Sequence, residues 1–396
     1  MTERNDLPGV LFYTRIRKSP FFYASRRHGP KLYSFASHMY HPRLYTDPVE
    51  EYWQLLEGVT LWDVGVERLV EITGPDAFTF TNMLCARDLS KCVVGQCKYV
   101  LMTAADGGIV NDPVLQRMGD NHFWLSCADS EVNLWAKGVA VNSGLDVTIG
   151  EPDIGTLQVQ GPRSKDVMVD LFGERLLDLP YYYFREYELD GMDVVVARTG
   201  YSLEIGYEIY LREASRLGMQ LWDAVWEAGK QHGMTVIGPC HIRRIEGGIL
   251  SYGADMGLDT NPYEVAMGYD WMVDLDEEKD DFIGKAALKE IKEEGVKRRL
   301  VGVEIAGDSL GSYIDGSMAD YFPVYHDRER VGKVTSACYS PRLEKNIGYA
   351  MVPIDLEGLG TELEVEAPSG RTTAVVAEKP FIDPNKEAVK EQLVAR

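Results

Sequence analysis

The feature that most constrains the fold is a local pattern that occurs twice. Residues 69–73 are mainly apolar and predict a strand, Gly74-Pro75 follows, and a helix is predicted through Leu84. Residues 157–160, then Gly161-Pro162 and a helix running to residue 173, repeat the same order. Proline suits the first helical position, because its missing N–H group would have no partner there. Two strand–Gly-Pro–helix units predict two related α/β layers.

A hairpin is predicted between residues 95 and 114. Residues 98–102 predict its first strand, the turn falls at 105–108, and the second strand ends on Asn111 and Asp112. Asp-Gly between two apolar runs is a strong hairpin signal, because glycine adopts the positive φ of the turn at low cost. Pro113 cannot donate to a ladder and ends the strand. From spacing alone, Asp112 is either an exposed charge at a strand end or a group that faces a ligand.

The remaining segments suggest further mixed structure and then a change of character. Strands are predicted at 123–126, 181–187 and 193–197, and helices at 213–230, 243–250 and 284–294. From residue 300, six short β-rich runs alternate with turn residues, which predicts a separate small barrel or sandwich. The charge run at 274–281 fits a boundary near residues 276–296, before the barrel or sandwich.

Composition excludes several classes of protein. A chain of 396 residues is expected to hold two or three domains. Its net charge of −21 argues against nucleic-acid binding, which needs cations to meet phosphates. Six scattered cysteines without a C-x-x-C pair and histidines without ligand spacing predict reduced thiols and no metal site. No run is long and apolar enough for a signal core or a membrane span, so a cytoplasmic protein is expected. Oligomeric state is not predicted.

Familiar catalytic motifs are absent. No G-x-G-x-x-G follows a strand, no G-x-x-x-x-G-K-[ST] occurs, and there is no G-x-S-x-G. What remains are carboxylates and aromatic residues near turns, together with a basic N-terminal cluster that contains Arg17. That cluster is either a solvated arm or a rim that meets an anionic group. These residues alone do not select a chemistry.

Four segments, in order, resemble the glycine-cleavage aminomethyltransferase superfamily of tetrahydrofolate-dependent enzymes. They are residues 107–112, 198–209, 244–253 and 334–347. Three further segments, 52–68, 87–100 and 124–138, resemble the dimethylsulfoniopropionate demethylases within that superfamily. Asn111 stands at the first position of the acidic doublet, as in the demethylases, and leaves Asp112 as the sole carboxylate. Residues 181–187 and 203–205 depart from the demethylase pattern.

The resemblance implies an α+β, three-domain, cloverleaf-like aminomethyltransferase fold, with two related α/β domains plus a C-terminal β-barrel. Residues 1–60 and 155–275 would form the folate-binding α/β domain, and 61–154 the second α/β domain, which carries the Asp112 hairpin. Residues 276–396 would form the barrel. Tetrahydrofolate would be held in a central channel as methyl acceptor.

The resemblance also implies roles for single residues. Asp112 would act near the reacting nitrogen, or only order the hairpin. The expected folate-binding residues are Tyr99, Asp112, Tyr201, Glu208 and Arg244. For the methyl donor, a cation would favour aromatic faces and a carboxylate would favour basic groups, and the expected residues are Tyr40, His41, Arg17, Tyr187 and Trp271. Each tyrosine could instead be plain core, Glu208 could face solvent, and Arg244 could pair with Glu246.

The implied activity is transfer of a methyl group from a small methyl-onium acid, such as dimethylsulfoniopropionate, to N5 of tetrahydrofolate. A sulfonium leaves as a neutral thioether and needs no general acid. Two alternatives remain open. One is a tetrahydrofolate-dependent O-demethylase of a methoxylated aromatic acid, which would need an acid such as His41. The other is a folate-binding protein without methyl transfer.

Overall fold

The computed structural model describes residues 13–128, 131–312 and 322–391. Both strand–Gly-Pro–helix units are confirmed: β4 (Leu69–Thr73) precedes α3 (Ala77–Leu84), and β11 (Ile154–Gln160) precedes α5 (Ser164–Phe172). Gly74 and Gly161 have φ of +121° and +115°, and a Cβ on Gly161 would lie 2.5 Å from the Gly58 oxygen. These conformations require glycine. Each proline lies in the turn before its helix, not at the first helical position as predicted.

The two units belong to two sheets with the same strand order. The first sheet runs β10-β4-β9-β8-β5 and the second runs β15-β3-β11-β14-β13-β12. In the second sheet, β11, β14, β13 and β12 lie side by side in the order in which β4, β9, β8 and β5 lie in the first. The additional strand β3 lies between β11 and β15. The further strands are β5 (Cys97–Tyr99), β8 (Val114–Gly119), β9 (His122–Ser126), β10 (Thr148–Gly150), β3 (Thr60–Asp63), β12 (Phe184–Leu189), β13 (Met192–Ala197), β14 (Gly206–Arg212) and β15 (Thr235–Val236).

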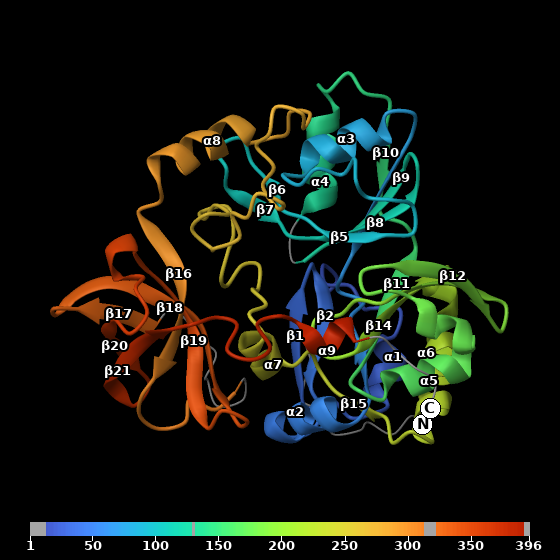
Figure 1. Ribbon diagram of the computed structural model, residues 1–396. Coiled ribbons are helices and arrows are strands. Elements are labelled where there is room, and N and C mark those ends of the chain that lie inside the picture. Colours follow the sequence, from blue (N-terminus) through green and yellow to red (C-terminus); the bar gives the residue numbers. More distant parts are fainter. Residues whose placement is uncertain (1–12, 129–130, 313–321, 392–396) are drawn as a thin grey trace.

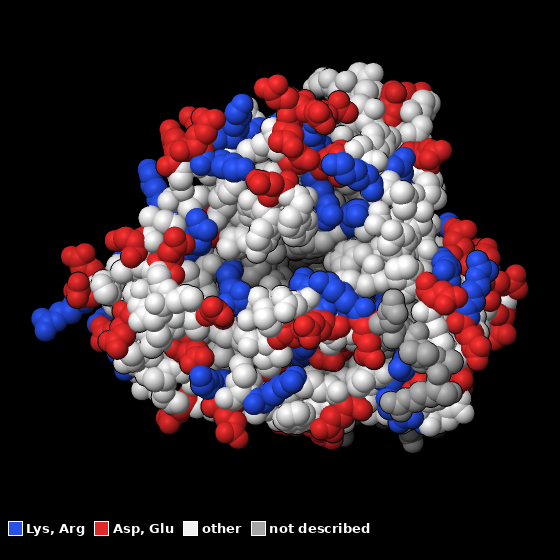
Figure 2. Space-filling view, viewed as in Figure 1, with Lys and Arg blue, Asp and Glu red and all other residues white. Residues whose placement is uncertain are grey.

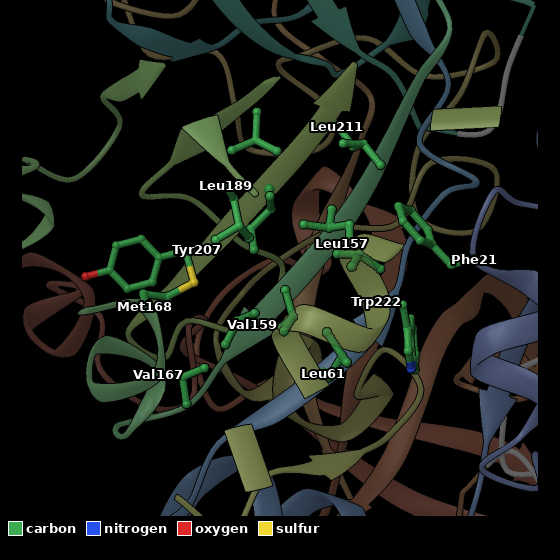
Figure 3. Packing of buried hydrophobic residues seen from close by; sticks show 14 of the residues in the cluster. Phe21, Leu61, Leu157, Val159, Val167, Met168, Leu189, Tyr207, Leu211 and Trp222 are labelled. Carbon is green, nitrogen blue, oxygen red and sulfur yellow. The ribbon is translucent and has the colours of Figure 1, made fainter. Parts of the chain in front are cut away.

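Helices cover one face of each sheet. Helices α3 and α4 (Val132–Ala140) pack on the five-stranded sheet through a buried cluster that includes Phe80, Leu115 and Leu125. Helices α5 and α6 (Ala214–Lys230) pack on the six-stranded sheet, where Leu157, Val159 and the α6 residue Trp222 share one core (Figure 3). Strand alternation therefore sends Gln158 and Glu208 to the opposite face, away from these helices.

The C-terminal part forms a closed barrel, which decides between the two predicted all-β forms. Its order is β16-β19-β18-β17-β20-β21. The strands are β16 (Arg298–Ile305), β17 (Phe322–His326), β18 (Glu329–Ser340), β19 (Lys345–Pro353), β20 (Glu362–Ala367) and β21 (Gly370–Ala377). Helix α8 (Lys285–Glu294) precedes the barrel, and the two sheets and the barrel form three lobes around a centre (Figure 1). The domain boundaries themselves remain a prediction.

Smaller elements fill the junctions. They are α1 (Phe22–Arg26), the hairpin β1 (Leu32–Ala36) and β2 (Met39–Leu44), α2 (Pro48–Glu57), η1 (Glu174–Asp178), α7 (His241–Glu246), η3 (Ile354–Leu356) and α9 (Glu387–Lys390). Helix α7 is shorter than predicted and ends at Gly247. After the barrel the chain returns to the six-stranded sheet, where the Arg198 guanidinium donates to the Val389 oxygen of α9 at 3.0 Å.

Two strand predictions need correction. Residues 98–102 are not one strand: β5 ends at Tyr99 and pairs with β8, whereas β6 (Met102–Thr103) pairs with β7 (Ile109–Asn111). The chain crosses between these two ladders at residues 100–101, and the Val100 N–H donates to the Pro113 oxygen at 3.1 Å. In the aromatic run 181–187, only Phe184 onward is strand, because Tyr182 adopts a φ of 63° in a turn.

Candidate functional site

The site lies where the helix-free faces of the two sheets meet. An apolar cluster joins Leu69, Cys97 and Trp124 of the five-stranded sheet to Val195 and Tyr210 of the six-stranded sheet. Two groups of polar side chains adjoin this cluster, and we call them together the seam. In one group, the Gln158 amide of β11 donates to Glu208 of β14 and to Glu67, which lies in the link before β4. In the other group, the Tyr99 hydroxyl of β5 donates to Asp112, which lies in the link before β8. Strand alternation places Gln158, Glu208 and Tyr99, whereas Glu67 and Asp112 come from connecting segments.

Asp112 directly follows β7, the return strand of the hairpin, which ends at Asn111, one residue earlier than predicted. Its Oδ2 accepts a hydrogen bond from the Tyr99 hydroxyl at 2.8 Å. Its Oδ1 is buried and has no hydrogen-bond partner among the described residues. Burial raises the pKa of Asp112 to about 7, although the Tyr99 hydrogen bond acts in the opposite direction. The neighbouring Asn111 side chain accepts from the Ala128 N–H at 3.2 Å, which holds the strand end in place.

Tyr99 and Tyr201 are the two aromatic residues predicted to bind folate. Both pack against the buried cluster between the α7 region and the barrel. Burial, and then the Asp112 charge, raise the pKa of Tyr99 well above its ordinary value. Burial raises the pKa of Tyr201, and the charges of Asp255 and then Asp112 contribute in the same direction. The Asp112 charge therefore acts on both tyrosines, and an aromatic ring is a surface on which a flat ligand can stack.

Glu208 is buried on β14 and does not face solvent. Its carboxylate accepts from the Gln158 amide at 2.8 Å, from the Thr199 hydroxyl at 2.5 Å and from the Tyr210 hydroxyl at 2.6 Å. Burial raises its pKa. The same Gln158 amide lies 3.2 Å from Oε1 of Glu67. Sequence reasoning missed Glu67 and Gln158, because only the folded arrangement of the two sheets brings them to Glu208.

Arg244 is a structural connection between α7 and the barrel. Its guanidinium donates to Asp255 at 2.6 Å and to the Ser336 hydroxyl of β18 at 2.6 Å. Asp255 in turn accepts from the Ser336 hydroxyl at 2.6 Å. Glu246 instead accepts from Tyr52 and Ser340. Arg244 therefore pairs with Asp255, not with Glu246 as the alternative prediction held.

Four of the predicted donor residues are held by contacts outside the seam. The Arg17 guanidinium pairs with Glu151 at 2.7 Å near the surface. Tyr40 and His41 are buried in the β1–β2 hairpin, and burial and the nearby Arg43 charge lower the pKa of His41 well below its ordinary value. Tyr187 packs against Phe172 on the helix-covered face of its sheet.

Trp271 is the exception. It is 56% exposed and stacks on Tyr269, with ring centroids 5.5 Å apart. The Arg87 guanidinium lies 5.0 Å from the Trp271 ring centroid. It also donates to the backbone carbonyl oxygen of Tyr99 at 3.1 Å. An aromatic and cationic group thus adjoins the strand that carries Tyr99. Arg87 lies in one of the segments that carried the family resemblance, which is the signal that could have identified it.

The centre of the molecule is hollowed. Figure 2 shows a depression near the centre of the view, below the position of β5 in Figure 1, with Lys and Arg side chains at its rim. This gathering of cations contrasts with the net charge of −21. Among the described residues, no group of three or more His, Cys, Asp and Glu side chains is arranged to hold a metal ion. Within the same residues, no helix combines the length and apolarity needed to cross a membrane.

Comparison with known proteins adds independent findings. The family described as GCVT N-terminal domain matches residues 21–277, and the glycine cleavage T-protein C-terminal barrel domain matches residues 298–383. Dimethylsulfoniopropionate demethylase DmdA from Ruegeria pomeroyi is 36% identical, over 92% of this chain and 97% of the relative. An aminomethyltransferase from Thermoanaerobacter pseudethanolicus is 30% identical, over 93% and 98%.

A solved structure shares the fold. The glycine cleavage system aminomethyltransferase T from Bartonella henselae superimposes with a TM-score of 0.81 at 22% identity, covering 93% of this chain and 99% of that one. At this identity the likeness concerns the fold alone. It agrees with the three-lobed arrangement and the C-terminal barrel.

Proposed function

Because the chain belongs to the glycine cleavage T-protein family of enzymes, we propose that it is a tetrahydrofolate-dependent methyltransferase. The proposed reaction moves a methyl group from a small methyl-onium acid, such as dimethylsulfoniopropionate, to N5 of tetrahydrofolate and yields 5-methyltetrahydrofolate. The relative with 36% identity is a demethylase of that sulfonium compound, which supports this choice of donor over the aminomethyl chemistry of the other relatives.

One observation carries the proposal: Asp112 presents a buried oxygen that has no hydrogen-bond partner among the residues that the structure describes. Unsatisfied buried acceptors are costly, so such an atom indicates a ligand donor. The carboxylate is aimed by Tyr99 and has a pKa of about 7. Near neutral pH both the ionised and the protonated carboxyl group are therefore populated, so Asp112 can accept a proton and release it, as general acid–base catalysis requires. A folate presents N–H groups that fit this acceptor.

Other residues of the chain would hold the same ligand. The Glu208 carboxylate suits the N–H edge of a pterin, because a charged acceptor makes stronger hydrogen bonds than a neutral one. Tyr99 and Tyr201 would pack against its rings. Folate would supply the nucleophilic nitrogen. Asp112 would receive the proton that this nitrogen loses, directly or through a water molecule, and the sulfonium sulfur would leave as a neutral thioether.

The residues considered for binding the methyl donor favour an onium compound over a methoxylated aromatic acid. A departing phenolate would need an acid, and His41 was the expected one. His41 is instead buried with a lowered pKa, so its imidazole is neutral at physiological pH. Trp271 and Tyr269 offer exposed aromatic faces close to Arg87, a combination that suits a cation bearing a carboxylate.

The test is a donor panel. The purified protein is incubated with tetrahydrofolate and, separately, with a sulfonium acid, a quaternary ammonium acid or a methoxylated aromatic acid, and 5-methyltetrahydrofolate is detected by mass. We expect product with the sulfonium acid and at least about 100-fold less in D112N. Product from the methoxylated acid alone would contradict the proposed donor class, and tight folate binding without product from any donor would support a binding protein.

A further inference from the structure

Two carboxylates in the seam share a single amide donor. Gln158 and Glu208 are register partners on β11 and β14. The Gln158 Nε2 atom lies 2.8 Å from Oε1 of Glu208 and 3.2 Å from Oε1 of Glu67. Glu67 lies in the link between β3 and β4, so the shared amide joins the two sheets. Two buried acidic groups this close cannot both be ionised without a large cost.

Within the described residues, no cation forms an ion pair with either carboxylate. Arg68, next to Glu67, pairs with Glu151 at 2.6 Å. The titratable groups that face the pair are uncharged at neutral pH. They are Tyr210 on β14, Tyr181 and Tyr182 in the turn before β12, Cys97 on β5 and Cys127 after β9. The pair must therefore hold a proton.

The hydrogen-bond donors decide which carboxylate is ionised. Glu208 accepts from three side chains at 2.5–2.8 Å, all of which stabilise an anion. In the described part of the chain, Glu67 accepts only from the Ser126 hydroxyl at 3.1 Å and from the Gln158 amide at 3.2 Å. Burial and the Glu208 charge raise the pKa of Glu67 well above its ordinary value. Gln158 Oε1 is also buried without a partner among the described residues, so this region has more hydrogen-bond acceptors than donors. A proton on Glu67 adds one donor and reduces the imbalance.

We propose that Glu67 and Glu208 share one proton, held on Glu67, and that Glu67 is the positioning residue that keeps Glu208 available as an ionised acceptor for the ligand. The identity of that ligand as a reduced folate rests on the proposed function. Loss of the proton from Glu67 would place a second negative charge beside Glu208 and disturb the Gln158 amide that aligns it. Folate affinity is therefore expected to fall as Glu67 ionises at alkaline pH.

The experiment compares wild type, E67Q and E208Q by calorimetric titration with tetrahydrofolate from about pH 6 to about pH 9. We expect wild-type affinity to fall at the alkaline end. E67Q should bind within about twofold of wild type at neutral pH and lose the alkaline fall, because its amide is always neutral. E208Q should bind about ten- to 100-fold more weakly at every pH. The control E186Q, which removes an exposed carboxylate from the same sheet, should behave as wild type.

A ligand-free readout separates this inference from the proposed function. In the infrared difference spectrum between wild type and E67Q, we expect the carbonyl band of a protonated carboxylic acid. Its absence, or an alkaline fall unchanged in E67Q, would overturn the shared proton. A wild-type protein that shows the band but no folate affinity would instead overturn the folate assignment.

A second variant covers the case in which E67Q does not fold. S126A removes the hydroxyl that supports an ionised Glu67, so the alkaline fall in affinity should move to higher pH. A fall that stays in place or moves to lower pH would contradict the inference.

Discussion

At the scale of single residues, Asp112 combines a functional position with a cost in stability. Burial raises its pKa from 3.8 to about 7. A carboxyl group whose pKa is raised in the folded state contributes its full stability below the unfolded pKa, and loses that contribution as pH rises through the folded pKa. The ionised form that suits catalysis is therefore the form that burial disfavours. Such a conflict is common where side chains serve function.

This conflict predicts opposite effects of D112N on activity and on stability. The amide cannot ionise, so the free energy of unfolding at about pH 8 should exceed that of wild type, by at most about 4 kcal/mol for a shift of this size. Near pH 4 the two proteins should be alike. Denaturant unfolding at both pH values measures the difference. Equal stability at about pH 8 would mean that Asp112 is not held in a low-dielectric site.

Tyr99 supplies the second prediction at this scale. Its hydroxyl donates to Asp112 and so favours the ionised carboxylate. Y99F should raise the pKa of Asp112 and move the acidic limb of the methyl-transfer rate profile upward by about one pH unit. Y187F removes a matched hydroxyl on the opposite face of the other sheet and should leave the profile in place. A profile that Y99F leaves unmoved would separate Tyr99 from the reacting group.

At the scale of secondary-structure elements, α7 is tied to the barrel by a buried network. Arg244 is 2% exposed and holds Asp255 and Ser336 together. R244M would leave Asp255 buried without its charge partner, so unfolding should become easier by about 3–5 kcal/mol. R17M breaks a partly exposed ion pair instead and should cost less than about 1 kcal/mol. Chemical denaturation of both variants checks this; an R244M protein as stable as R17M would contradict it.

Element by element, local chemistry predicted most of the structure. The two Gly-Pro turns, the hairpin that ends at Asp112 and the β-rich C-terminal runs all carry their signals within a few residues. The division of residues 98–102 between two ladders carries no such signal, because it depends on which distant strands pair with each half. The turn at Tyr182 is similar, since its carbonyl is fixed by the N–H of Cys97 at 2.7 Å.

At the scale of the whole molecule, the site depends on how two sheets face each other. The family resemblance predicted Asp112, Tyr99 and Glu208 as site residues, and the fold places them in the seam. The resemblance did not identify Glu67 or Gln158, whose importance comes from contacts across 50 to 91 residues of sequence. The aromatic and basic residues expected around a donor illustrate the same limit, because composition does not distinguish Tyr187 in a core from Trp271 near the seam.

The most direct test of the central claim is hydrogen–deuterium exchange of the full chain with and without tetrahydrofolate. If a reduced folate lies in the seam beside Asp112, exchange should slow in residues 99–114 and 199–210, and this protection should weaken in D112N. Protection confined to the barrel, or no change at saturating folate, would contradict the claim.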